Sequence, residues 1–318
     1  MPIDYLHNHS DFPGLLRILG AQMEIHESLI EKDYWIMHVL YGLQKQGFDF
    51  ELKGGTSLSK GYKIIDRFSE DIDIHIKPPA SLSINENTRN TNKKTIEARK
   101  NFYDWVAGNI NIDGIVSIER DTVFDDLTYY RSGGIRLLYE NKTDKIGGVK
   151  GGVLLEAGFD TVTPNTKLKI SSWAYERALE NKSIQFIDNR AIDIPCYHPG
   201  YTFVEKLQTI ATKYRQEING EKDRPNFMRQ YYDVYCLLGV DEVIRFIGTP
   251  EYEAHKQKRF PGADLKIPVS QNEAFLLNTP AIRSDFKKRY TSTAALYYKG
   301  QPDFDELIMR IKEFLPRL

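Results

Sequence analysis

Hydrophobic and polar residues show two different spacings near the start of the chain, one typical of a helix and one typical of a strand. Over residues 26–46, HESLIEKDYWIMHVLYGLQKQ, apolar residues recur close to helical spacing, which predicts a long amphipathic helix. The next segment, FDFELKGG at 48–55, alternates apolar and polar residues before a double glycine, which predicts a strand that enters a tight turn. A second helix is expected over 57–68, SLSKGYKIIDRF, with an apolar stripe made of Leu58, Tyr62 and Ile65.

The middle of the chain changes from a polar to a strand-like pattern. Residues 81–98 are polar and are expected to form a mobile loop, long enough for a flap, before a helix that ends near Trp105 and Val106. Between later strands, KIGGVKGG at 145–152 is interpreted as a flexible hairpin connection, with phosphate binding as a minor alternative. The strands themselves are expected at GIVSIER (114–120), GGIRLLYEN (133–141), GVLLEAGFD (152–160) and KLKISSW (167–173).

The second half of the chain has helical periodicity. It is carried by TFVEKLQTIATKYRQ (202–216), NFMRQYYDVYCLLG (226–239), TPAIRSDFKKRYTSTAALYY (279–298) and FDELIMRIKEFL (304–315). We therefore expect an α+β fold in two parts. A core with N-terminal helices would span residues 1–190, and an α-helical C-terminal domain would span residues 191–318.

The composition of the chain argues against several classes of protein but does not identify its class. With 43 Lys and Arg against 44 Asp and Glu, the chain has no general basic field for nucleic acid, so such contacts would have to come from local patches. Its start has no basic leader before a long apolar run, and no later stretch is apolar enough to span a bilayer. Two cysteines are too few for a disulfide framework. We expect a soluble, unprocessed, cytoplasmic protein with no membrane partner.

Two carboxylates share one face of the strand expected at EDIDIHI, residues 70–76. Alternation turns the three isoleucines to the core and turns Asp71, Asp73 and His75 to the other face. The Cα atoms of Asp71 and Asp73 would lie about 6.5–7 Å apart, close enough to share Mg²⁺ or Mn²⁺ through oxygen ligands. His75 is left out because hard cations prefer oxygen. By itself the pair is also typical of a half-buried edge strand with solvated carboxylates.

The loop before this strand favours a ligand. Gly54 and Gly55 let the backbone turn tightly and expose its N–H groups, and Thr56 or Ser57 is expected to cap the following helix. Such a loop at a helix N-terminus can bind phosphate groups. It matches neither GxxxxGK[ST] nor GxGxxG. A phosphate loop beside paired carboxylates predicts an NTP bound together with a divalent metal.

The segment GGTSLSKGYKIIDRFSEDIDIHI, residues 54–76, resembles motif I of the AbiEii/AbiGii toxin family in the DNA polymerase β-like nucleotidyltransferase superfamily. EKDYWIMHVL at 31–40 resembles the helix that precedes this motif. The resemblance implies a polymerase-β-like core, a mixed sheet with packed helices, and a third catalytic and metal-binding carboxylate on a neighbouring strand. Glu156 is the first candidate, and Glu140 and Asp160 remain open. An ordinary polar residue on a sheet face is an equal interpretation of Glu156.

Two later segments resemble further motifs of this family. In TFVEKL, 202–207, the resemblance implies that Lys206 meets nucleotide phosphates, with Lys213 as a second contact to the departing pyrophosphate. By helical spacing alone, both lysines lie on a polar strip typical of a solvated face. RQYYDVYCL resembles the R-x-x-x-D motif, which implies that Arg229 and Asp233 line the cleft and that Asp233 orients Lys206. Spacing alone would make Arg229 and Asp233 a surface ion pair.

These features predict a metal-dependent nucleotidyltransferase that moves a nucleoside monophosphate from an NTP to an acceptor hydroxyl, a reaction of the EC 2.7.7 type. The resemblance implies a toxin of a toxin–antitoxin or abortive-infection (phage-defence) system, acting on the 3′ end of tRNA or on a protein, with a cognate antitoxin. Basic clusters at 255–260 and 287–289 would suit RNA but are also typical of solvated helices. Two alternatives stay open. One is a nucleotide-sugar-dependent glycosyltransferase, which would not need the glycine loop, and the other is a degenerate, non-catalytic partner-binding protein of the same fold.

Overall fold

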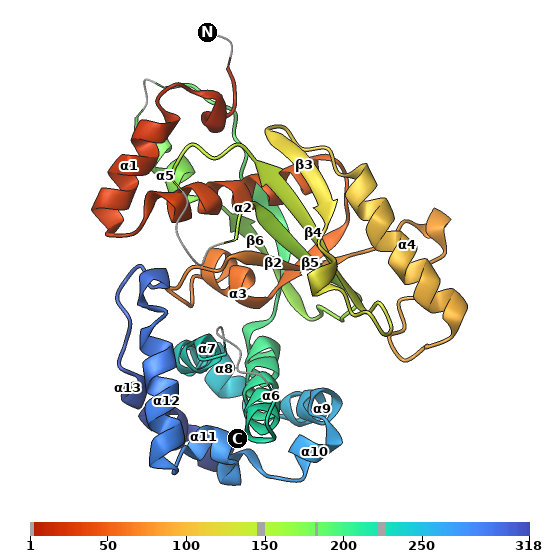
Figure 1. Ribbon diagram of the computed structural model, residues 1–318, viewed down its shortest axis with the longest axis vertical. Coiled ribbons are helices and arrows are strands. Elements are labelled where there is room, and N and C mark those ends of the chain that lie inside the picture. Colours follow the sequence, from red (N-terminus) through yellow and green to blue (C-terminus); the bar gives the residue numbers. More distant parts are fainter. Residues whose placement is uncertain (1–2, 145–149, 182–183, 222–226) are drawn as a thin grey trace. The chain divides into compact units, whose positions relative to one another are not determined.

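The computed structural model describes residues 3–144, 150–181, 184–221 and 227–318, and Figure 1 shows its helices and strands. Contacts along the chain divide it into two units. The first contains residues 1–62 and 68–197, and the second contains residues 63–67 and 198–318. The chain therefore enters the second unit briefly before residue 68 and returns to it after β7.

Among the described residues, a mixed seven-stranded sheet forms the centre of the first unit, with the order β3-β4-β5-β2-β1-β7-β6. The strands are β1 Phe50–Lys53, β2 Asp71–Ile76, β3 Ile115–Arg120, β4 Ser132–Tyr139, β5 Val153–Gly158, β6 Asn165–Ile170 and β7 Ala191–Tyr197. β2 is antiparallel to β1 and parallel to β5. The strands expected from alternation are confirmed, as is the α+β fold. β7 pairs with β1 and β6 and so lies in the first unit, on the C-terminal side of the boundary expected near residue 190.

The described residues of the first unit also form the α-helices α1 Phe12–Met23, α2 Glu27–Lys45, α3 Gly54–Thr56, α4 Lys93–Asn109 and α5 Trp173–Leu179. Short 3₁₀ turns lie at Leu6–Asn8, Ala80–Leu82 and Thr122–Phe124. α2 packs both on strands β5 and β7 and on helices α1 and α5. Its predicted bounds are confirmed, but its amphipathic character is not, because Glu31, Lys32 and Asp33 are only 1%, 2% and 1% exposed. A helix with neighbours on several sides buries polar positions too, and these must find partners.

The helix expected over 57–68 ends early. After α3 the chain makes one π-helical turn, Ser57–Gly61. Lys63 then adopts a left-handed φ of 57°, which ends helical progression. Residues 63–67 are instead held within the second unit, where the amide of Tyr298 donates a hydrogen bond of 3.1 Å to a carbonyl of this segment. The predicted apolar stripe is therefore divided between the two units.

The polar segment 81–98 is tied to the helix that follows it. The guanidinium of Arg99, on α4, is fully buried and donates hydrogen bonds to the carbonyls of Asn85 (3.2 Å) and Asn87 (2.5 Å). The expected flap is thus a loop whose backbone is bound by a side chain of α4. Most of the connection expected at 145–152 lies outside the described residues.

The second unit is helical, as the periodicity predicts. Its helices are α6 Pro199–Ile218, α7 Arg229–Leu237, α8 Asp241–Phe246, α9 Pro250–Arg259, α10 Gly262–Leu265, α11 Glu273–Leu276, α12 Pro280–Thr291 and α13 Phe304–Phe314, with 3₁₀ turns at Val269–Gln271, Ala294–Leu296 and Leu315–Arg317. α6 packs on α7, α8, α9 and α11. None of the described helices is both long enough and apolar enough to span a bilayer.

Candidate active site

β2 presents its carboxylate pair as alternation predicts. Ile72, Ile74 and Ile76 are 0%, 0% and 1% exposed, whereas Asp71 and Asp73 are half-buried on the opposite face. β2 has hydrogen-bonded neighbours on both sides, β1 and β5, so it is not an edge strand. An interior strand that keeps two acids on one face holds them against electrostatic repulsion, which the edge-strand interpretation does not explain.

The glycine loop packs directly against the second carboxylate. Lys53, at the end of β1, is opposite Asp73 in the strand ladder, and Gly54 follows with a left-handed φ of 69°. A Cβ atom at Gly54 would lie 1.9 Å from Oδ2 of Asp73. Both the backbone conformation and this close approach therefore require glycine. The loop and the carboxylate pair meet at one place in the first unit.

Thr56 and Ser57 do not cap the helix as expected. No side chain caps α3. The hydroxyl of Thr56 instead donates to the carbonyl of Asp71 (2.6 Å), which ties the loop to the start of β2. Ser57 is 1% exposed, and its hydroxyl has no hydrogen-bond partner among the described residues. Of the four loop residues expected to contact the nucleotide, Gly54 is half-buried, and Gly55, Thr56 and Ser57 are buried.

Negative charge accumulates around Asp71. Burial raises the pKa of Asp71 above its ordinary value, and the carboxylates of Glu70 and Asp73 raise it further. The ammonium groups of Lys32 and Lys150 act in the opposite direction but do not cancel this effect. A carboxylate pair under such repulsion attracts a cation, and its oxygen donors suit Mg²⁺ or Mn²⁺.

Among the candidates for a third carboxylate, Glu156 is the acid nearest in register. On β5 it pairs with Asp73 on β2, so the two side chains belong to the same face of the sheet. Glu140 is exposed and paired with a lysine, and Asp160 is paired with Lys53 at 3.0 Å. In the described part of the chain, no three acidic, histidine or cysteine side chains gather as a metal-holding group. The candidate metal site therefore consists of the Asp71 and Asp73 carboxylates. Mg²⁺ is commonly bound by one or two protein carboxylates, with phosphate and water oxygens as its remaining ligands.

A second charged cluster lies in the helical unit and is centred on Asp233. This carboxylate is fully buried and receives two hydrogen bonds from Arg67, of 2.6 and 2.7 Å, and an ion pair from Lys206 at 2.8 Å. Burial alone would raise the pKa of Asp233, but Arg67 and Lys206 bring it down to about 2. The expected contact between Asp233 and Lys206 is therefore present. Sequence reasoning missed Arg67, although it stands inside the RFSEDIDI phrase of motif I.

Arg229 and Asp233 are not a surface pair. They are 8% and 0% exposed, because α7 packs on both α6 and α13. Lys213, on α6, is half-buried. The predicted site residues thus fall into two groups. Gly54 to Ser57, Asp71, Asp73 and Glu156 belong to the first unit, and Lys206, Lys213, Arg229 and Asp233 belong to the second.

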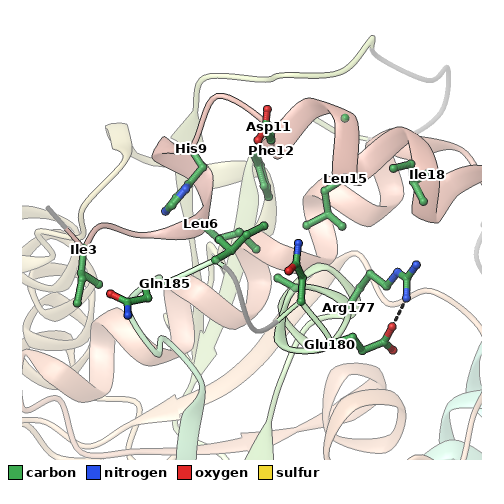
Figure 2. Close-up of a pocket in the computed structure, with 14 residues that line it drawn as sticks. Ile3, Leu6, His9, Asp11, Phe12, Leu15, Ile18, Arg177, Glu180 and Gln185 are labelled. Carbon is green, nitrogen blue, oxygen red and sulfur yellow. Dashed lines mark hydrogen bonds and ion pairs between the residues drawn. The ribbon is translucent and has the colours of Figure 1, made fainter. Parts of the chain in front are cut away.

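A pocket of about 960 Å³ lies elsewhere in the first unit, along α1 and α5 (Figure 2). Its walls include the apolar side chains of Leu6, Phe12 and Leu15 and the Arg177–Glu180 ion pair. None of the residues predicted to act on a nucleotide lines it.

Comparison with known proteins agrees with the motifs. The profile of the AbiEii family, described as nucleotidyl transferase AbiEii toxin of a type IV toxin–antitoxin system, matches residues 38–310. No curated protein matches the chain. Among solved structures, it is similar to an antigenic nucleotidyltransferase-like protein from Paracoccidioides brasiliensis, at 11% identity and a TM-score of 0.32, over 73% of this chain and 95% of that one. The family match includes the glycine loop, both aspartates of β2 and the Asp233 cluster, and the chain belongs to the AbiEii family of nucleotidyltransferase toxins.

Proposed function

We propose that this protein transfers a nucleoside monophosphate from an NTP to an acceptor hydroxyl and releases pyrophosphate. One observation carries the proposal: Asp71 and Asp73 share a face of β2, and the backbone of Gly54 lies against Asp73. In a nucleotidyltransferase family, this arrangement supplies oxygen ligands and a close backbone approach for phosphates at the same place.

The carboxylates of Asp71 and Asp73 would hold Mg²⁺ or Mn²⁺. Burial raises the pKa of Asp71, and the neighbouring carboxylates of Glu70 and Asp73 raise it further; a divalent cation would relieve that repulsion, which supports this assignment. When bound, such a cation supplies charge neutralisation for the triphosphate. Glu156, in register with Asp73, is the residue we assign to accept the proton of the acceptor hydroxyl or to add a third oxygen ligand.

Lys206 is the residue we assign to the phosphates, with Lys213 and Arg229 as further nucleotide contacts. Around Asp233, the cations Arg67 and Lys206 both pair with the one buried carboxylate. An ammonium that a buried acid holds in place is pre-positioned for an anion, and pyrophosphate is the anion that leaves in this reaction. Asp233 would orient the ammonium of Lys206 through their 2.8 Å ion pair.

For the acceptor we favour RNA, at the 3′ end of tRNA, and for a partner a cognate antitoxin protein. Membership of a type IV toxin–antitoxin family supports the antitoxin, and the RNA acceptor rests only on the resemblance of the sequence motifs to that family. The two basic clusters add little, because many of their charges are paired within the helical unit. Arg259 binds Glu205, Lys287 binds Asp303 and Asp305, and Arg289 binds Glu217.

Labelled nucleotides test the reaction class. The protein, Mg²⁺ and total tRNA are incubated with each NTP, labelled in turn on the α- or the γ-phosphate. Transfer of a nucleoside monophosphate would place only the α-label on RNA and release the γ-label as pyrophosphate. Label on the protein fraction would redirect us to a protein acceptor. No incorporation from any NTP, with neither RNA nor protein labelled, would contradict the proposed function. Sugar transfer from a nucleotide sugar would favour the glycosyltransferase instead.

A further inference from the structure

Two of three consecutive charged residues on α2 bind segments of the first unit that lie far away in sequence. Glu31 accepts hydrogen bonds from the amides of Lys142 (2.7 Å) and Thr143 (3.1 Å). Lys32 donates to the carbonyl of Lys150 (2.8 Å). Successive helical side chains point in different directions, so each of these residues reaches a different neighbour. Charged side chains of the buried helix α2 therefore bind the backbone of separate segments of the first unit.

Asp33, the third charged residue, contacts the turn that follows the glycine loop. One of its oxygens pairs with the ammonium of Lys60 at 2.7 Å, and the other accepts a hydrogen bond of 2.8 Å from the amide of Trp173. The ammonium of Lys60 also lies 4.7 Å from the centre of the Trp173 ring. Asp33 is 1% exposed, and the Lys60 side chain is 12% exposed. An ion pair, a backbone hydrogen bond and a cation–π contact thus meet at one buried point.

Lys60 lies a few residues after the glycine loop. It lies in the π-helical turn Ser57–Gly61, which directly continues the Gly54–Thr56 segment. Immediately after this turn the chain leaves the first unit, at residue 63. A π-helical turn is rare and is frequently found at functional sites. The position of the turn, and with it the approach of Gly54 to Asp73, depends on side chains that hold it from outside.

We propose that Asp33 is a positioning residue for nucleotide binding, which acts through Lys60 to fix the glycine loop against Asp73. The inference rests on the proposed nucleotidyl transfer and adds to it a residue outside the catalytic strand. A buried ion pair contributes little net stability, so a role in fixing geometry accounts for its presence better than a role in stability.

The matched pair Asp33→Asn and Glu31→Gln tests this role. Both variants replace a buried acid of α2 by its amide, but only the first removes the contact to the glycine loop. We expect the KM for NTP to rise on the order of 10-fold in Asp33→Asn, with kcat within about 2-fold, and both constants to stay within about 2-fold in Glu31→Gln. Equal KM values in the two variants would overturn the proposal.

Lys60→Met removes the same contact from the loop side, and it carries the test if Asp33→Asn does not fold. The double variant Asp33→Asn/Lys60→Met should show no larger increase in KM than either single variant, because one interaction is lost in all three. Increases that multiply in the double variant would show that the two residues act separately.

Hydrogen exchange of the free protein separates this inference from the proposed function. Amides in residues 54–61 should exchange faster in Asp33→Asn than in the wild type, and Glu31→Gln should leave them unchanged. If the wild type transfers no nucleotide, the proposed function fails, and these exchange rates still decide whether Asp33 holds the loop. Unchanged exchange in Asp33→Asn would refute the anchoring itself.

Discussion

Replacing Arg67 by methionine should destabilise the helical unit far more than loss of an exposed arginine. Arg67 is 4% exposed and makes two hydrogen bonds to Asp233, which is fully buried. Arg67→Met keeps much of the side-chain volume but leaves this carboxylate to Lys206. The perturbation therefore removes charge and hydrogen bonds from a site that water does not reach.

Two estimates bound the loss of stability in Arg67→Met. Breaking a buried ion pair from one side typically costs about 3–5 kcal/mol. The pKa of Asp233, about 2 against its ordinary 3.8, corresponds to roughly 2 kcal/mol of stability from its charged form. Lys206 supplies part of this stabilisation, because it also pairs with Asp233. We expect Arg67→Met to lower the free energy of unfolding by about 2–4 kcal/mol at pH 7.

Urea unfolding followed by far-UV circular dichroism measures this loss, with Arg283→Met as the control. Arg283 pairs with Asp305 where the two side chains are 36% and 45% exposed, so its loss should cost less than about 1 kcal/mol. Equal losses in the two variants would refute the reasoning.

The pH dependence gives a second check on the same pair. The folded-state pKa of Asp233 lies below its ordinary value, so its contribution is present above pH 3.8 and is lost as the pH falls toward 2. The difference in stability between wild type and Arg67→Met should therefore shrink over this interval. A difference that widens on acidification would contradict the assignment.

Three further changes test the site. Gly54→Ala should lower kcat/KM for NTP by on the order of 100-fold, because its Cβ would meet Asp73 at 1.9 Å, whereas Gly108→Ala, with open space around it, should have no effect on this constant. Thr56→Val should lower the free energy of unfolding by about 1 kcal/mol, measured in urea, since it loses the hydrogen bond to the Asp71 carbonyl; an unchanged value would argue against that bond. Lys206→Met should raise the KM for NTP while the protein stays folded, because Arg67 still pairs with Asp233; a KM equal to that of the exposed-lysine control Lys258→Met would remove its assigned role.

Local patterns predicted the parts of this fold that local forces decide. The alternation of isoleucine and aspartate gave β2 its buried and its polar face, and helical spacing placed α2, α6 and α7 within a few residues of their bounds. The double glycine before β2 was also informative, because a left-handed φ and contact with Asp73 leave little choice at Gly54. These features depend on residues close together in the chain.

The features that sequence reasoning missed depend on partners far away in the chain. Arg67 and Asp233 are 166 residues apart, and helical spacing around Asp233 indicated only a surface ion pair. Residues 63–67 continue a helical pattern, yet their backbone pairs with Tyr298, far away in the chain, and both belong to the second unit. The polar face expected on α2 is buried because α1, α5 and the sheet all pack on that helix. Periodicity reports which positions share a face, and it does not say how many faces are covered.

The most direct test of catalysis by the β2 carboxylates is a single-turnover assay with α-labelled NTP and Mg²⁺. It compares nucleotide transfer by the wild type with transfer by Asp71→Asn. Asp71→Asn removes one of two repelling carboxylates and opens no cavity, so it should stay folded by circular dichroism. We predict that incorporation falls by on the order of 1000-fold or more while the unfolding curve is unchanged. Incorporation at the wild-type rate, or loss of activity only together with loss of the fold, would contradict a catalytic role for the β2 carboxylates.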